Sequence, residues 1–272
     1  MCTSFAAYYT KPLYGMNFAI FETPLRLRII TGEGGISIFY LDVFINGNYL
    51  ETAAMNSNGL FGNVQENISE RHTQIENGDN QITMEDLFYS ALKKSAKISD
   101  IEEIIGSKKI KYKDVPSINY KLHNLFADKY GNAMIVETSN GENDITFIDG
   151  KHIVLTNFAV GQSKGKQYFE VAGAGDDRYK VTYDFIRRKN YSFKLEDGFE
   201  ILKRTHQDSS LCSMMFDPLE LEIFLCFNMD FSRTWKVKLL EKSMETYSGF
   251  DRKIRFNLNA NGVINTELQR VT

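Results

Sequence analysis

Residues 1–5 read Met1-Cys2-Thr3-Ser4-Phe5, and this stretch decides how the rest of the chain is interpreted. If Met1 is removed, Cys2 carries a thiol and a free α-amine in one residue. A thiol attacks as its thiolate, and an α-amine with a pKa of roughly 7.7 to 8.0 can accept the proton that the thiol releases. Cys2 is therefore a candidate nucleophile that brings its own base. The plain alternative is that Cys2 is a small apolar residue at the start of a strand.

The segment after Cys2 is expected to form a series of strands. Up to residue 64, runs rich in aromatic and β-branched residues alternate with short turn sequences. Asn46-Gly47 is typical of a tight hairpin turn. The expected strands are 4–9, 13–20, 26–31, 36–45 and 49–55.

Helical periodicity appears in two places between further strand-like segments. Apolar residues recur at intervals of three and four within 83–97, and further helices are expected at 99–105, 178–189 and 195–205. The remaining expected strands are 125–128, 133–138, 145–148, 152–156, 211–216, 222–227, 234–239 and 254–258. No linker rich in Pro or Ser interrupts this alternation. We therefore expect one α+β domain over residues 1–272, with helices covering stacked sheets.

Composition and charge exclude several classes of protein. The chain has 272 residues, a net charge of −3, no polybasic face and no run of eighteen apolar residues. Neither nucleic acid nor a membrane is an expected partner. Because no signal peptide is recognised either, we expect a cytoplasmic protein.

Cysteine and histidine usage gives no reason to expect a metal ion or a cofactor. The three cysteines are too few and too scattered for a disulfide framework or a structural zinc site. Cys212 and Cys226 lie in apolar runs that are typical of buried strands. The four histidines lack the paired spacing of a metal site. They are His72, His123, His152 and His206.

Three further stretches, read together with Cys2, form an ordered set. Residues 55–60 contain N-x-x-G-L, with Asn63 three positions further on. Residues 126–137 contain D-x-x-G-x-x-x-x-x-E, and residues 154–157 read V-L-T-N. In order and approximate spacing they resemble the choloylglycine hydrolase and penicillin V acylase group of the N-terminal-nucleophile superfamily. The resemblance runs thinly from Cys2 to about Trp235, and residues 213–218 look closer to the small members related to acyl-CoA:6-aminopenicillanic acid acyltransferase.

The resemblance implies a fold, a reaction and a set of site residues. The fold would be a four-layer αββα sandwich, and the reaction would be hydrolysis of a linear carbon–nitrogen amide bond through an acyl-thioester on Cys2. The substrate would be a small N-acyl amide, no cofactor would be needed, and a homo-oligomer is compatible with the group. Asn63 and Asn157 match the group's oxyanion positions, although Asn56 and Asn67 lie close enough to Asn63 for the alignment to slip. The alternative for both residues is an ordinary role in turns.

The sequence departs from the group at one decisive place. Members usually carry G-R-N-x-D after the first turn, where the arginine supports the thiolate and the aspartate orients the α-amine. Here Met16 replaces the arginine and Ala19 replaces the aspartate. Neither side chain can hold an ammonium group or lower the pKa of a thiol. Two alternatives to an amidase therefore stay open. One is a weakened or inactive relative that binds a small amphipathic ligand, and the other is an acyltransferase.

Overall fold

The computed structural model describes residues 1–71, 80–111 and 120–269, and its strands form two large antiparallel sheets. The first sheet contains, in spatial order, β13 (His152–Leu155), β1 (Thr3–Tyr8), β2 (Pro12–Ala19), β14 (Ser210–Asp217), β15 (Glu222–Phe227), β16 (Thr234–Lys238), β17 (Ser243–Ser248) and β18 (Arg255–Asn257). The second contains β12 (Glu142–Phe147), β11 (Ala133–Ser139), β10 (Tyr120–Ala127), β6 (Phe61–Asn63), β5 (Asn48–Asn56), β4 (Ser37–Ile45), β3 (Leu25–Thr31) and β19 (Val263–Ile264), and β7 (Gln65–Arg71) pairs with β10.

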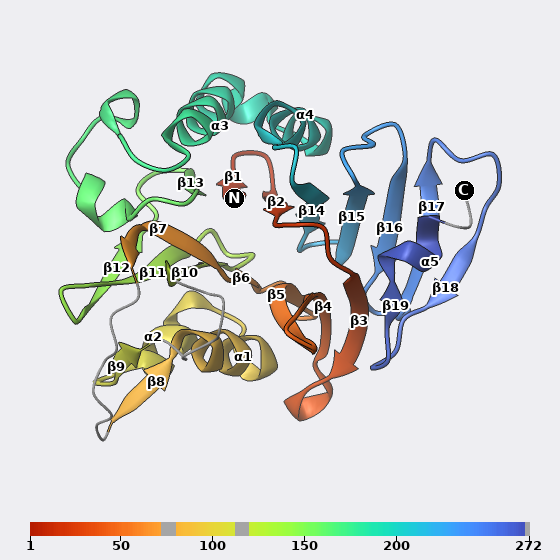
Figure 1. Ribbon diagram of the computed structural model, residues 1–272, viewed down its shortest axis with the longest axis horizontal. Coiled ribbons are helices and arrows are strands. Elements are labelled where there is room, and N and C mark those ends of the chain that lie inside the picture. Colours follow the sequence, from red (N-terminus) through yellow and green to blue (C-terminus); the bar gives the residue numbers. More distant parts are fainter. Residues whose placement is uncertain (72–79, 112–119, 270–272) are drawn as a thin grey trace.

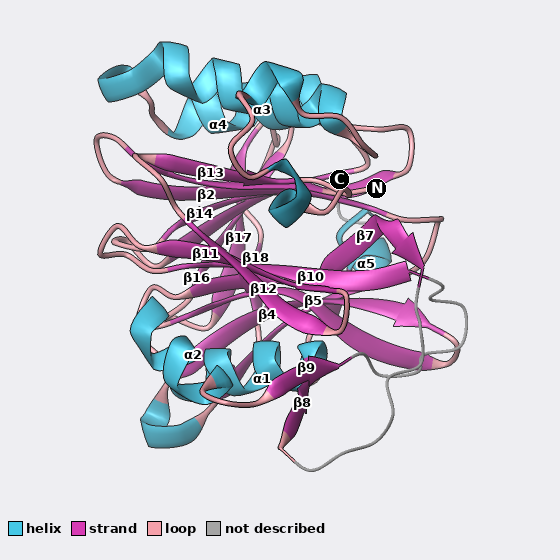
Figure 2. Cartoon of the chain, turned by 90° about the vertical axis from the view of Figure 1, so that its left-hand side faces the viewer, coloured by secondary structure: helices cyan, strands magenta, loops and turns pink. Residues whose placement is uncertain are grey.

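Helices cover the outer face of each sheet (Figure 2). The first sheet is covered by α3 (Asp176–Lys189) and α4 (Leu195–Thr205), and the second by α1 (Met84–Lys94) and α2 (Ile98–Ile105). A short α5 (Asn265–Gln269) follows β19, and β8 (Gln81–Thr83) pairs in parallel with β9 (Lys109–Lys111). Figure 1 shows the N-terminus next to β1, with α3 passing close by. The resulting four-layer αββα sandwich confirms the predicted fold class.

Three hydrophobic clusters hold the layers together. The largest lies between the two sheets, a second packs the second sheet against α1 and α2, and a third packs the first sheet against α3 and α4. The alternation in β3 shows how the sequence produces this, because Leu25, Leu27 and Ile29 are buried while Arg26 and Arg28 point away from the core. A fully buried side chain of this kind contributes roughly 1.5 to 3 kcal/mol.

Most elements lie where the sequence predicts them. The hairpin between β4 and β5 turns at Asn46 and Gly47, which both have positive φ, as the tight turn requires. The helix expected at 83–97 begins at Met84, after the Thr83 cap, and ends at Lys94. The sequence does not predict the strand β7, because the strand-like pattern of the first segment ends at Val64. This strand supplies part of the candidate site.

Candidate functional site

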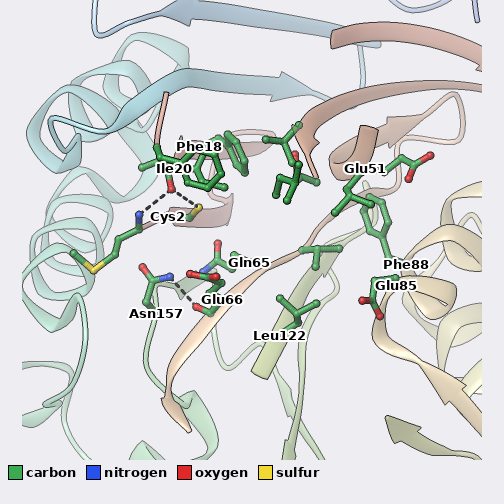
Figure 3. Close-up of a pocket in the computed structure, with 18 of the residues that line it drawn as sticks. Cys2, Phe18, Ile20, Glu51, Gln65, Glu66, Glu85, Phe88, Leu122 and Asn157 are labelled. Atoms are coloured by element: carbon green, nitrogen blue, oxygen red, sulfur yellow. Dashed lines mark hydrogen bonds between the residues drawn. The ribbon is translucent and has the colours of Figure 1, made fainter. Parts of the chain in front are cut away.

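Cys2 lies immediately before β1 and is 5% exposed. Its Sγ is 3.9 Å from the main-chain oxygen of Ala19, the last residue of β2. The α-ammonium of Met1 donates a 2.8 Å hydrogen bond to the same oxygen (Figure 3). One carbonyl oxygen therefore holds both the N-terminal ammonium and the candidate nucleophile.

A cavity of about 660 Å³ opens beside Cys2. It runs from Cys2 and Asn157 at one end to Glu85 and Phe88 of α1 at the other (Figure 3). Its walls are mostly apolar and come from both sheets and α1. They include Phe18, Ile20, Val43, Val64, Phe88 and Leu122. The volume and the apolar walls suit a small amphipathic molecule.

Arg178, on the first turn of α3, contacts the main chain at Cys2. Its Nη1 donates to the main-chain oxygen of Cys2 and, at 2.7 Å, to Oγ1 of Thr3. Its Nη2 donates to Oδ1 of Asn157 at 3.0 Å. The guanidinium also lies against Gly175, where a Cβ atom would come within 2.2 Å of Nη2. Arg178 therefore links the nucleophile, its strand and a predicted oxyanion residue.

The charge of Arg178 is buried without an acidic partner. The residue is 3% exposed, and no carboxylate in the described part of the chain forms an ion pair with it. Burial lowers the pKa of the guanidinium, and the charges of Cys2 and of the neighbouring Asp177 oppose that shift. A buried charge is costly unless an opposite charge compensates it. A Cys2 thiolate would supply such a charge.

Asn157 lines the cavity and has a fixed amide orientation. Because Arg178 can only donate, the amide must present Oδ1 to it and turn its NH₂ group the other way. One Nδ2 hydrogen is donated to the main-chain oxygen of Glu66 at 2.7 Å. The amide has a second hydrogen, so Asn157 keeps one donor for a ligand in the cavity.

Asn63 lies deeper in the molecule. It is fully buried and is not among the described residues that line the cavity. Its Nδ2 donates to Ser4 Oγ at 2.9 Å and to Gln65 Oε1 at 3.2 Å, and its Oδ1 accepts from the main-chain N–H of Leu125 at 2.8 Å. Both Nδ2 hydrogens therefore have partners inside the protein. The oxyanion role of Asn63 stays a prediction, and this geometry gives it no support.

The two replaced positions are both buried in β2. Met16 is fully buried, and its sulfur lies 3.7 Å from Nδ2 of Asn63. Ala19 contributes its main-chain oxygen where an aspartate side chain was expected. Near Cys2 the structure instead has the guanidinium of Arg178 from α3 and the main-chain carbonyl of Ala19 itself.

Several groups act on the Cys2 thiol. Burial raises its pKa, and the positive charges of the N-terminal ammonium and of Arg178 oppose this. Glu66 is close enough to raise the pKa of Cys2 further. In this form, with Met1 attached, the thiol is mostly protonated at neutral pH.

Glu66 of β7 was not among the predicted site residues. It is half-buried and lines the cavity beside Gln65 and Asn157 (Figure 3). Burial raises the pKa of its carboxyl group, and the N-terminal ammonium lowers it. A polar stretch such as residues 65–69 carries only one apolar side chain, Ile68, so no strand signal marks it.

No metal site is found in the described ranges. No group of three or more His, Cys, Asp or Glu residues there could hold a metal ion. His123 Nδ1 lies 2.9 Å from Glu137 Oε1 and is fully buried. His72 lies outside the described residues. No helix in the described part of the chain is both long and apolar enough to cross a membrane.

Comparison with known proteins identifies the fold. Neither a family model nor a curated protein matches the chain. A mutant of conjugated bile acid hydrolase from Clostridium perfringens is similar in structure, with a TM-score of 0.58 and 12% identity over 95% of this chain and 97% of that one. A second variant of the same enzyme has a TM-score of 0.57 and 12% identity over the same shares.

A third solved structure has the same architecture. Penicillin V acylase from Agrobacterium tumefaciens has a TM-score of 0.57 and 15% identity over 87% of this chain and 91% of that one. At such identities the likeness concerns the fold alone. The chain therefore has the αββα fold of the N-terminal-nucleophile hydrolases, similar to a conjugated bile acid hydrolase and a penicillin V acylase.

Proposed function

We propose that this protein is a linear amide hydrolase in which Cys2, once Met1 is removed, is the nucleophile. The observation that carries the proposal is the position of Cys2. Its thiol lies at one end of a largely apolar 660 Å³ cavity, 3.9 Å from the Ala19 carbonyl oxygen, and its main chain binds Arg178, which also binds Asn157. The fold supports the same reaction class, because the similar structures are those of amide hydrolases.

The first half of the reaction would form an acyl-thioester. The Cys2 α-amine accepts the thiol proton, and the thiolate attacks the carbonyl carbon of the amide. Arg178 favours the thiolate through its charge. The second Nδ2 hydrogen of Asn157 donates to the oxygen on which negative charge develops. The α-amine then returns the proton to the leaving amine, and the carbon–nitrogen bond breaks.

The second half would release the acid. Water attacks the thioester carbonyl, the α-amine accepts a proton from the water, and the thiol leaves with a proton. The Ala19 carbonyl can orient the α-amine, as it now holds the Met1 ammonium at 2.8 Å. A neutral carbonyl adds no negative charge that would favour the protonated amine, so the amine remains available as a base.

The intact mass of the protein tests this proposal. Protein produced in a bacterial cytoplasm is weighed before and after a short incubation with a panel of N-acyl amides. We expect loss of Met1 and an acyl mass on Cys2 that is absent in Cys2→Ala. Retention of Met1, or a free Cys2 that gains no adduct while no amine is released, contradicts the proposal.

A second candidate function is binding of a small amphipathic ligand without efficient turnover. The specific observation in its favour is the replacement of the expected arginine and aspartate by Met16 and Ala19, together with the raised pKa of Cys2. Saturable binding of N-acyl amides with no acyl-enzyme and no product would favour it.

Acyl transfer is a variant of the first proposal, suggested by the resemblance of residues 213–218 to the small acyltransferase-like members. The same thioester would then react with an amine instead of water. Adding a primary amine to the incubation separates the two outcomes. Hydrolysis yields the free acid, whereas transfer yields the acyl group on the added amine.

A further inference from the structure

The charged side chains that line the cavity in the described part of the chain are all acidic. Its described lining includes the carboxylates of Glu51, Glu66, Glu85 and Asp86 and contains no lysine, arginine or histidine. Glu51 is neutralised by Arg28, whose Nη2 lies 2.5 Å from its Oε1. The cavity therefore repels an anionic ligand and attracts a cationic one.

Glu66 is the carboxylate at the Cys2 end. Figure 3 shows it between Gln65 and Asn157, while Glu85 lies with Phe88 at the opposite end. No described residue donates a hydrogen bond to the Glu66 carboxylate or forms an ion pair with it. A half-buried carboxylate without such a partner is a ready counter-ion for a ligand cation.

An ammonium group already occupies this end of the cavity. The α-ammonium of Met1 donates to the Ala19 oxygen at 2.8 Å, and its charge lowers the pKa of Glu66. Met1 itself lines the cavity. A positive charge is therefore accommodated within electrostatic reach of Glu66. Removal of Met1 would free the space that its side chain and ammonium take up in the cavity.

The other charged group near Cys2 does not reverse this preference. Arg178 is buried behind Cys2 and Asn157 and is not among the described residues that line the cavity. Its two Nη atoms donate to Cys2, Thr3 and Asn157. The lining also contains apolar side chains, among them Phe18 and Leu122, which suit a hydrocarbon acyl chain.

We propose that the substrate is an N-acyl diamine, in which an apolar acyl chain fills the cavity and the second, charged amino group of the leaving amine binds the carboxylate of Glu66. The inference rests on the proposed amidase function and names its substrate class. The reaction breaks the amide carbon–nitrogen bond and adds water, which yields a carboxylic acid and a diamine. It needs no further reactant.

Three amides with the same octanoyl group test the inference. They are N-octanoyl-1,3-diaminopropane, a cation; N-octanoylbutylamine, which is neutral; and N-octanoyl-β-alanine, an anion. Binding to Cys2→Ala protein without Met1, as verified by mass, is measured by calorimetry. We expect the cation to bind at least about ten-fold more tightly than the anion, with the neutral amide between them.

Variants of two acidic residues identify the carboxylate responsible. In Cys2→Ala/Glu66→Gln the preference should collapse to within about two-fold, because a tenfold difference corresponds to only about 1.4 kcal/mol of charge interaction. Cys2→Ala/Asp86→Asn is the matched control, since Asp86 is exposed and belongs to α1 at the far end. It should keep most of the preference. Equal binding of cation and anion, or a preference unchanged by Glu66→Gln, overturns the inference.

Hydrolysis by the protein with Cys2 intact separates this inference from the proposed function. Preferential binding of the cation that depends on Glu66, without release of diaminopropane, supports the inference and contradicts the amidase proposal. Hydrolysis at equal rates for all three amides supports the amidase proposal and contradicts the inference about the diamine.

Discussion

Cys2 and Cys212 are both buried thiols close to the first sheet, yet their surroundings differ. Cys2 is 5% exposed and has a guanidinium, an ammonium and a cavity beside it. Cys212 of β14 is 1% exposed, and burial and the thiol of Cys226 both raise its pKa. Burial raises the pKa of both thiols. Nearby positive charges oppose this increase at Cys2, whereas none does so at Cys212. The comparison teaches that burial alone makes a thiol inert, whereas burial beside fixed cations makes it a candidate nucleophile.

Replacing Cys2 by alanine should have the largest effect on activity of all the variants. Cys2→Ala is expected to lower amide hydrolysis by roughly 10³-fold or more, because the thioester can no longer form. Cys212→Ala should leave the rate within about two-fold and cost on the order of 1 kcal/mol of stability. Amine release and urea unfolding measure the two effects. Equal activity in Cys2→Ala and the unchanged protein would remove the distinction between the thiols.

The two predicted asparagines sharpen the comparison next. Asn157→Ala should lower kcat by roughly 10²-fold or more, because it removes the proposed oxyanion donor from the cavity lining. Asn63→Ala should instead lower the free energy of unfolding by about 1 to 3 kcal/mol, because Ser4 and Leu125 lose a buried partner. Steady-state kinetics and denaturant titration on both variants measure this. A kcat loss of similar size in Asn63→Ala, without a loss of stability, would restore its predicted oxyanion role.

Removing the cation near Cys2 should have a smaller effect on reactivity. Without the guanidinium the thiolate is less favoured, so Arg178→Met should move the pKa of Cys2 upward and slow its alkylation at pH 7 by about ten-fold. Arg178→Lys should restore part of the rate. Iodoacetamide labelling between pH 6 and 10, read by peptide mass, follows Cys2 and Cys212 in one sample. Cys212 should not change.

Arg187→Met is the matched control for this experiment, since Arg187 lies on the same helix and pairs with Asp184 at the surface. Arg187→Met should not change the pH dependence of Cys2 labelling. A Cys2 profile that is identical in all of these proteins would mean that Arg178 has no influence on the thiol.

The smallest effect is expected at the glycine that supports Arg178. Gly175 has φ 80°, and a Cβ there would meet the guanidinium, so Gly175→Ala should cost about 1 to 3 kcal/mol of stability and slow Cys2 labelling modestly. Gly141→Ala is the control, because Gly141 also has φ 80° but no atom within 4 Å of an added Cβ. Gly141→Ala should lose stability but label Cys2 at the unchanged rate. Slower labelling of Cys2 in both variants would contradict a specific contact with Arg178.

Local patterns were sufficient to predict most of the fold. Three patterns depend only on residues that are neighbours in the sequence, and one sequence is therefore enough to recognise them. They are the alternation in β3, the Asn46-Gly47 turn and the 3–4 spacing in α1. The strand β7 was missed because Gln65, Glu66 and Asn67 are polar, and what holds them in a strand is pairing with β10. Pairing of this kind is a tertiary property that local periodicity does not report.

The candidate site was only partly predictable, for a related reason. Cys2 and Asn157 were found through motifs, and the cavity brings both together. Arg178 was expected only as the start of a helix, since nothing in its own neighbourhood indicates that it reaches a residue 176 positions earlier. Glu66 was missed with its strand. Residues that act through long-range contacts leave no spacing signal.

The carbonyl of Ala19 has a consequence for how such a site can change over evolutionary time. Every amino acid supplies the same main-chain oxygen, so substitutions at position 19 that preserve the β2 backbone leave this acceptor in place. An aspartate in that role can be lost by one base change, whereas a carbonyl held by strand pairing persists as long as the sheet does. Searches for identical side chains pass over an anchor of this kind, and the architecture of the strand is what is inherited.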